Sequence, residues 1–188
     1  MSSTPVIKCE KVYKIFGANA KKMLQGTEGN VDAKTFQEAG CIVGGNNASC
    51  EVSKGEMLVV MGLSGSGKST LLRCISRLTD ATAGKIYIEG QDLLALKNKE
   101  LIELRRNKMG MVFQSFALLP HKTVLENIAF PLQIKGMKTE DSISKAMEMV
   151  KLVGLEGREN YFSRELSGGQ QQRVGIARSL AVEPDIWF

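Results

Sequence analysis

Histidine is nearly absent from this 188-residue chain, and its four cysteines form no C-x-x-C pair. No histidine lies at zinc spacing from a cysteine, so we expect reduced thiols rather than a zinc site or a disulfide framework. No apolar run approaches the ~18–20 residues that span a bilayer, and the opening MSSTPVIKCEKVYKIFG lacks the apolar centre of a signal peptide. These absences exclude membrane-spanning, disulfide-stapled and zinc-binding classes and predict a soluble chain located in the cytoplasm.

The basic residues do not gather into one patch, although the formal net charge is +5. The densest basic stretch, KNKELIELRRNK, interleaves Glu100 and Glu103 with its lysines and arginines. This pattern is typical of a solvated helix face, so we predict no nucleic-acid partner. With 43% apolar residues, the chain has room for one domain with a real core.

The first part of the chain alternates strand and helix patterns. Residues 7–12 resemble a short strand, and the apolar run EMLVVMG (56–62) is typical of a strand buried on both faces. STLLRCISRL (69–78) has helical spacing, and KIYIEGQD (85–92) alternates and ends in a turn. The Gly- and Asn-rich residues 17–47 look like an insertion, in which VDAKTFQEAG predicts a short helix ended by Gly40.

The middle of the chain is predicted to be helical. EDSISKAMEMVKLVGL places Ile143, Ala146, Met147 and Val150 on one face of an amphipathic helix that Gly154 ends. MGMVFQ (109–114) before it and the final DIWF (185–188) after it have the pattern of short strands. We therefore predict an α/β core with a helical insert at residues 116–165.

One stretch has the spacing of a phosphate-binding loop. GLSGSGKST fits G-x-x-x-x-G-K-[ST] between a predicted strand and a predicted helix. The glycines let backbone N–H groups surround phosphates, the lysine adds a point charge, and the serine hydroxyl is an oxygen ligand that Mg²⁺ prefers. The predicted ATP- and Mg-binding residues are Gly62, Leu63, Ser64, Gly65, Ser66, Gly67, Lys68, Ser69 and Thr70.

A second anion site is predicted 100 residues later, in LSGGQQQR. Ser167, Gly168 and Gly169 open a helix there, and a helix N-terminus with a free hydroxyl and bare amides attracts anions. Together with Gln170, these residues form the second predicted phosphate-binding group.

With both motifs in place, the sequence resembles the ATPase subunits of ABC transporters, whose signature is LSGGQ. The resemblance implies a P-loop NTPase fold in which one subunit's signature closes on the γ-phosphate held by a second subunit. It also implies that Gln114 is the glutamine that coordinates Mg²⁺ or the attacking water, so that Lys68 and Gln114 are the catalytic residues. Phe16 matches the aromatic residue that stacks on adenine, and Tyr13 is its competitor.

The same resemblance divides the chain into three parts. They are a nucleotide-binding core at 1–115, a helical subdomain at 116–165, and a signature helix with the start of the Walker B strand at 166–188. The stretch ALLPHKTVLENIAF resembles the part of the family that faces the membrane partner, and we expect its His121 to be a surface residue. The fold is expected to be incomplete at the C-terminus, because the family's Walker B carboxylates would follow Phe188.

The insertion at 17–47 and the stretch EAGCIVGGNNASCEVSKGE resemble the importers of glycine betaine, proline and related osmolytes. This resemblance implies an ATPase on the cytoplasmic face of the inner membrane, with a head-to-tail partner subunit, an integral membrane permease and a periplasmic or surface solute-binding protein. It also implies ATP hydrolysis by the full-length protein, whereas we expect residues 1–188 alone to be inactive. An amino-acid importer ATPase, a soluble ABC ATPase of DNA repair or translation, and a nucleotide-binding fragment without turnover are the alternatives.

Overall fold

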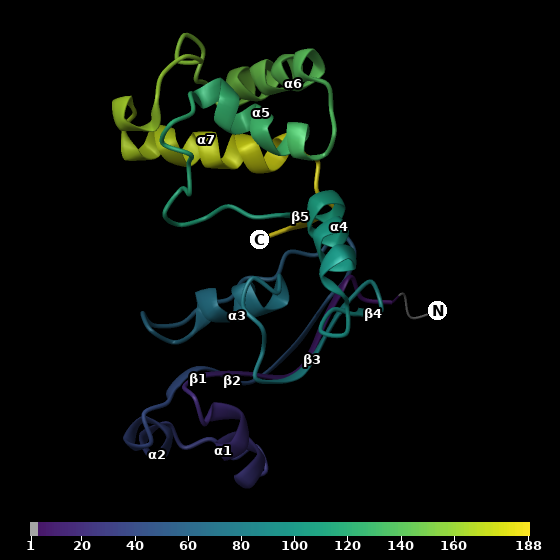
Figure 1. Ribbon diagram of the computed structural model, residues 1–188, viewed down its shortest axis with the longest axis vertical. Helices are drawn as coiled ribbons and strands as arrows, with labels where there is room; N and C mark the ends of the chain where they lie inside the picture. The colour runs from purple at the N-terminus through teal and green to yellow at the C-terminus, as the bar shows by residue number, and fades with distance from the viewer. Residues whose placement is uncertain (1–3) are drawn as a thin grey trace. The chain divides into compact units, whose positions relative to one another are not determined.

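A computed structural model describes residues 4–188 of the chain (Figure 1). The chain forms two compact units, one that ends at Asn98 and one that covers Lys99–Phe188. The observed division therefore falls earlier in the sequence than residue 116, where we expected the helical subdomain to begin. The three functional parts at 1–115, 116–165 and 166–188 stay a prediction.

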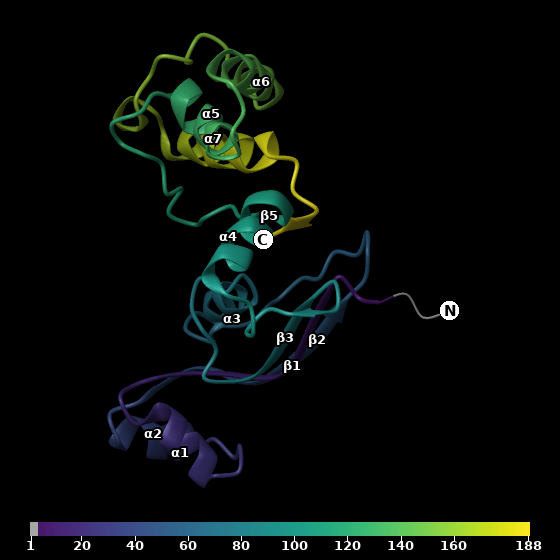
Figure 2. The ribbon, with the colours of Figure 1, turned by 45° about the vertical axis from the view of Figure 1, so that its right-hand side comes forward.

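An antiparallel sheet forms the centre of the first unit (Figure 2). Its strands are β1 (Ile7–Phe16), β2 (Ile42–Val52), β3 (Ala83–Ile88) and β4 (Gln91–Asp92), in the order β2-β1-β3-β4. The predicted strand at 7–12 is thus longer than expected, and the end of the predicted insertion is strand. The turn predicted at Gly90-Gln91-Asp92 is present one residue earlier, at Glu89 and Gly90, because Gln91 and Asp92 form β4 and pair with the end of β3.

Two short helices of the insertion pack together at one end of β1 and β2 (Figure 1). They are α1 (Ala20–Gly26), which was not expected from the sequence, and α2 (Ala33–Glu38), which was predicted. The Asp32 carboxylate caps α2 by accepting the Thr35 N–H at 2.9 Å, and Gly40 follows with a positive φ. Their core contains Tyr13, Ile15, Ala20, Leu24, Phe36 and Cys41.

The strand predicted at 56–62 is not present, and that prediction was wrong. Residues 56–62 have no regular secondary structure, and Met57 and Met61 are 86% and 85% exposed. A strand requires at least one hydrogen-bonded neighbour, because its backbone N–H and C=O groups have no partners within the strand itself. Within residues 4–188 no strand pairs with this run, so its apolar pattern alone does not produce a strand.

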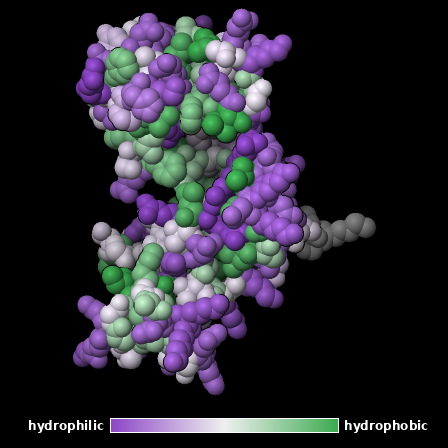
Figure 3. All heavy atoms as spheres, in the orientation of Figure 1, coloured by the Kyte–Doolittle hydropathy of each residue, from purple (hydrophilic) through white to green (hydrophobic). Residues whose placement is uncertain are grey.

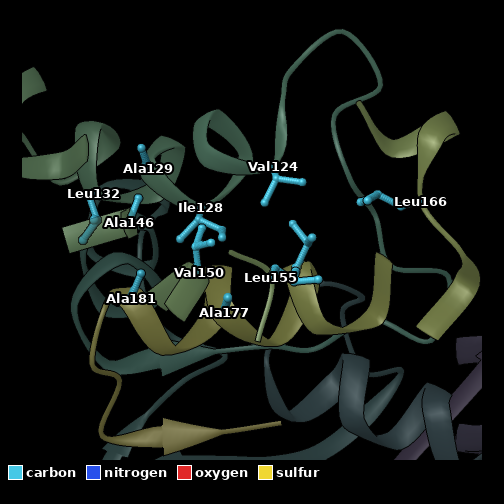
Figure 4. Close-up of a cluster of buried hydrophobic side chains, with 11 residues drawn as sticks. Val124, Ile128, Ala129, Leu132, Ala146, Val150, Leu155, Leu166, Ala177 and Ala181 are labelled. Carbon is cyan, nitrogen blue, oxygen red and sulfur yellow. The ribbon is translucent and has the colours of Figure 1, made fainter. Parts of the chain in front are cut away.

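The second unit is built on three packed helices, α5 (Val124–Ile134), α6 (Thr139–Leu152) and α7 (Gly168–Ala181). Their buried side chains point toward one another and form one core (Figure 4). Ala146 and Val150 of the predicted stripe belong to this core, and Ile143 packs against it. Met147 does not belong to this core, because its side chain is 44% exposed. The buried face of α6 therefore contains three of the four predicted residues.

Two short parallel strands, β5 (Met109–Gly110) and β6 (Ile186–Trp187), complete the second unit together with a 3₁₀ turn at Ser163–Glu165. Both strands were predicted, although only the first two residues of MGMVFQ lie in the ladder. The pairing continues through the Phe188 N–H, which donates to Gly110 O, and the Val112 N–H, which donates to Phe188 O. The mixed α/β fold class is confirmed.

Helix α4 (Asn98–Lys108) is the predicted charged helix, and hydrophilic side chains cover most of its visible surface (Figure 3). Leu101 is its one buried residue. Arg106 pairs with Glu103 at 2.8 Å on the exposed side. Within residues 4–188, no helix is long and apolar enough to cross a membrane.

The loop before α5 is held by one buried amide side chain. Asn127 accepts the Leu119 N–H at 2.8 Å and donates to the carbonyl oxygens of Leu119, Lys122 and Thr123 at 2.9–3.1 Å. His121 lies in this loop and is exposed, as expected. The loop therefore depends on Asn127 for its conformation, because the side chain replaces the backbone partners that a regular element would supply.

We expect Asn127→Ala to lower the free energy of unfolding by roughly 2 kcal/mol, because the Leu119 N–H and the Lys122 carbonyl lose their hydrogen-bond partner and the buried side chain leaves a cavity. Chemical denaturation followed by circular dichroism measures this change. The matched control is Asn107→Ala on the exposed side of α4, which should change stability by less than about 0.5 kcal/mol. Equal losses in the two variants would contradict the role given to Asn127.

Candidate functional site

The phosphate loop, residues 62–67, leads directly into α3 (Lys68–Ile75) as the motif requires. Gly67 is the N-cap of α3 with a φ of 89°, a conformation that favours glycine. A Cβ at Gly67 would also overlap the carbonyl oxygen of Gly44 on β2. This contact places the start of α3 directly against the sheet.

The Lys68 ammonium group is turned back over the phosphate loop. It donates to the carbonyl oxygens of Gly62 at 2.7 Å and Leu63 at 2.6 Å, and to Ser66 Oγ at 3.3 Å. The loop was expected to direct its backbone N–H groups toward the phosphates. The Ser66 N–H does not do so, because it donates to Leu63 O at 3.2 Å within the turn of the loop itself. The cation and the free N–H groups of the first turn of α3 both favour an anion at this place.

Phe16 lies beside the start of α3, at the end of β1. Its ring is 43% exposed, and Lys14 Nζ lies 4.8 Å from the ring centroid. A Cβ on Gly44 would come within 2.7 Å of Phe16 Cε2 and 3.1 Å of Thr70 Cγ2. The structure thus brings Phe16 and Thr70 together across Gly44, and the Phe16 side chain is partly exposed there with the Lys14 ammonium over its ring.

Tyr13, the competitor for adenine stacking, is in a different environment. Its side chain is 8% exposed within the core of the insertion, and its hydroxyl donates to Gly29 O at 3.2 Å. A buried ring with a bonded hydroxyl has no free face for a base. The structure therefore favours Phe16.

In the second unit, Ser167 caps α7 through a capping box. The Gln170 N–H donates to Ser167 Oγ at 3.3 Å, and the Ser167 N–H donates to Gln170 Oε1 at 2.9 Å. The expectation of a free hydroxyl was therefore wrong, because its oxygen already accepts a hydrogen bond. The O–H still has a proton to donate, and Gly168 and Gly169 are exposed in the first turn, where N–H groups lack a partner within the helix.

Gln114 lies in an exposed turn shortly after β5. The two residues that follow Ser115 both have positive φ, 60° at Phe116 and 47° at Ala117, which is uncommon for residues other than glycine. A Cβ on Gly168 would touch the Phe116 ring at 4.0 Å, so this turn lies along α7. The second unit thus brings the segment of Gln114 to the helix that carries the signature.

Arg178 of α7 holds this turn, a role that was not predicted from the sequence. Its guanidinium donates to Ala117 O at 2.7 Å and to Phe116 O at 3.1 Å. Burial lowers the pKa of the Arg178 guanidinium. The sequence does contain an indication of this role. Arg178 is a single charged residue among small and apolar residues in VGIARSLAV, and a charge in such surroundings is expected to have a specific partner.

The predicted metal ligands Ser69 and Gln114 belong to different units, and each is exposed. Among residues 4–188, no group of three or more His, Cys, Asp or Glu side chains is placed to hold a metal ion. Ser69 on the first turn of α3 offers a hydroxyl oxygen beside Lys68, which fits a hard cation bound together with phosphates.

Comparisons with known proteins agree with this geometry. A family model described as ABC transporter matches residues 45–188. The trimethylamine N-oxide transport system ATP-binding protein TmoW of Pelagibacter ubique is 88% identical over 186 residues, which are 99% of this chain and 54% of that protein. The glycine betaine transport ATP-binding protein OpuAA of Bacillus subtilis is 50% identical over 181 residues, which are 96% of this chain and 43% of that protein.

Among solved structures, a dimeric post-hydrolysis state of the ATP-binding cassette MJ0796 bound to ADP and Pi is 37% identical, with a TM-score of 0.80. That match covers 96% of this chain and 72% of the other. The chain spans about half the length of the curated relatives it matches. The resemblance stated from the two motifs is confirmed, and the chain belongs to the ABC transporter family.

Proposed function

We propose that this chain is the nucleotide-binding part of an ATPase subunit that powers an ABC importer of small methylated amines. The main observation in support of nucleotide binding is that Phe16, Gly44 and Thr70 lie close together at the start of α3. An exposed ring for a base and a cationic loop for phosphates lie next to each other there. The names of the relatives, which refer to trimethylamine N-oxide and glycine betaine, support the class of solute.

In this proposal, the first unit binds ATP. Phe16 stacks on the adenine, and Lys68 exchanges the carbonyl oxygens of Gly62 and Leu63 for the β- and γ-phosphates. The Ser69 hydroxyl would be an oxygen ligand to Mg²⁺, which when bound would supply positive charge beside the phosphates. The backbone of the phosphate loop and the N-terminal end of α3 fix the position of the anion.

The second unit acts on the nucleotide of a second ATPase subunit, in a head-to-tail dimer. Ser167, Gly168, Gly169 and Gln170 face the γ-phosphate bound by the partner, with the exposed glycine amides and the Ser167 O–H as donors. Gln114 is not part of this trans contact: its amide oxygen would hold the attacking water or, together with Ser69, the Mg²⁺ of the nucleotide. The dimeric state of the solved ATP-binding cassette supports this arrangement.

The insertion at residues 17–47 reduces the number of candidate solutes. The general family model begins at residue 45, whereas the matches to TmoW and OpuAA extend over 99% and 96% of the chain and so include nearly all of residues 17–47. This favours the quaternary-amine branch over an amino-acid importer. Because the protein at 88% identity is named for trimethylamine N-oxide, we place that compound before glycine betaine and proline. In this proposal the ATPase lies at the cytoplasmic face of the inner membrane, and the system also contains an integral membrane permease and a periplasmic or surface solute-binding protein.

Lys68→Ala is expected to weaken ATP binding at least tenfold, about 1.4 kcal/mol, because a charge-assisted contact to phosphate is lost. Titration with a fluorescent ATP analogue measures the dissociation constant. The matched control is Lys54→Ala, an exposed lysine of the same unit, which should leave the constant unchanged. Equal losses would remove Lys68 from the nucleotide site.

Residues 1–188 alone are expected to hydrolyse no ATP above background. Phosphate release by this chain, measured beside its Lys68→Ala variant, tests that prediction.

Transport by the whole protein tests the solute. In cells that depend on it for uptake, together with its permease and solute-binding protein, labelled trimethylamine N-oxide should accumulate with the parent and with Lys54→Ala. It should not accumulate with Lys68→Ala, because the driving reaction is lost. Excess unlabelled proline should not compete. Uptake of glycine betaine without uptake of trimethylamine N-oxide would overturn the solute assignment and leave the ATPase assignment in place.

Arg178→Ala should lower kcat for ATP hydrolysis by roughly tenfold in the assembled transporter, without changing the nucleotide dissociation constant. The variant frees the carbonyl oxygens of Phe116 and Ala117, so the backbone relaxes from its positive φ and the segment of Gln114 shifts. Arg173→Ala, on an exposed part of the same helix, is the control. An unchanged kcat, or an equal loss of nucleotide binding, would show that Arg178 does not position Gln114.

A further inference from the structure

Two cysteines face each other in the first unit, at a place that the nucleotide proposal does not use. Cys9 of β1 and Cys50 of β2 are direct partners in the antiparallel ladder, and both are free thiols. Residues opposite each other in such a ladder have Cα atoms about 4.5–5.5 Å apart, which lies within the range of a disulfide. The pairing in the ladder thus gives the two cysteines a Cα separation that a disulfide can span.

The two thiols are unequal in exposure and in acidity. Cys9 is 2% exposed, whereas Cys50 is half-buried. A hydrogen bond from the Cys9 thiol lowers the pKa of the Cys50 thiol to about 7, and the same hydrogen bond together with burial raises the pKa of Cys9. Cys50 is thus partly a thiolate near neutral pH, and Cys9 is a thiol that stays protonated beside it.

A cavity of about 640 Å³ gives access to the pair, because both cysteines belong to its lining. Its charged lining residues are Lys8, Glu10, Lys11, Glu51 and Lys85. Lys8 pairs with Glu10 at 3.1 Å and with Glu51 at 3.0 Å, so the lining has one more cation than anion. This balance suits a small anionic reagent.

The other two cysteines of the chain lie in different surroundings. Cys74 of α3 is fully buried, and burial raises the pKa of its thiol. Cys41 is buried in the core of the insertion, where its Sγ lies 3.9 Å from Met23 Sδ. Neither belongs to the lining of the cavity.

We propose that Cys50 and Cys9 are a redox-active pair that a low-molecular-weight disulfide, such as oxidised glutathione, converts into a reversible cross-strand disulfide. The Cys50 thiolate attacks one sulfur of glutathione disulfide, forms a mixed disulfide and releases one glutathione thiolate. Cys9 then loses its proton to solvent and attacks Cys50 Sγ, which forms the Cys9–Cys50 bond and releases the second glutathione thiolate. Glutathione disulfide is reduced by two electrons, and the two cysteines are oxidised.

The disulfide would fasten β1 to β2 just before their register becomes irregular, since the ladder shifts between Cys9 and Val12. It would also close the chain segment that contains α1, α2 and their connections. A cross-link of this kind restricts the unfolded chain more than the folded one. Oxidation is therefore expected to raise the midpoint of thermal unfolding.

Treatment of the purified protein with oxidised glutathione, followed by intact mass and non-reducing peptide mapping, tests the pair. We expect a loss of two hydrogen atoms, a linked Cys9–Cys50 peptide, a higher unfolding midpoint and reversal by dithiothreitol. Cys9→Ala should instead retain glutathione on Cys50, while Cys41→Ala should behave as the parent. A linked peptide that contains Cys74 or Cys41, or no linked peptide, would overturn the proposal.

The pH dependence of alkylation gives a second test that does not require the disulfide to form. In the parent, iodoacetamide should modify Cys50 with a midpoint near pH 7 and leave Cys41 and Cys74 largely unmodified in the folded protein. Cys9→Ala removes the hydrogen-bond donor, so the pKa of Cys50 rises and its alkylation at pH 7 should slow roughly tenfold. An unchanged midpoint in Cys9→Ala would show that Cys9 does not activate Cys50.

Discussion

The first unit depends on one close backbone contact, between Gly44 on β2 and Gly67 at the end of the phosphate loop. A side chain at either position would collide, at Gly67 with the Gly44 carbonyl and at Gly44 with the Phe16 ring. Because β2 pairs with β1 along nearly its whole length, this contact fixes the start of α3 relative to both strands. The sheet then carries Phe16 and positions the helix that begins at Lys68, although helices α1 and α2 separate Phe16 from Gly44 in sequence.

Features that depend on neighbouring residues were predicted well. The phosphate loop followed from the spacing of its glycines and Lys68, and the capped start of α7 followed from Ser167. The apolar periodicity of α6 and the alternation of β3 also gave the correct elements. In each case the residues that decide the structure lie within about one or two turns of one another, so the local pattern contains the cause.

Features that depend on distant partners were not predicted. Residues 56–62 have the composition of a buried strand, but a strand forms only where another strand supplies hydrogen bonds. Gly44 was assigned to an insertion because its importance comes from Gly67 and Phe16, which lie far from it in sequence. Arg178 was missed for the same reason, since its partners are two carbonyl groups near residue 116.

Strand β1 carries both a residue of the cysteine pair and the aromatic residue proposed to stack on adenine. Its residue Cys9 pairs with Cys50, and its last residue, Phe16, pairs with Ile42 two residues before Gly44. Between them the ladder shifts register three times, and Lys11 and Asn47 have positive φ. These irregularities lie between the cysteine pair and the strand end that carries Phe16. A disulfide between Cys9 and Cys50 would therefore cross-link β1 and β2 in the regular part of the ladder. The irregular part of the ladder contains Gly44, where the backbone lies close to both Phe16 and Gly67.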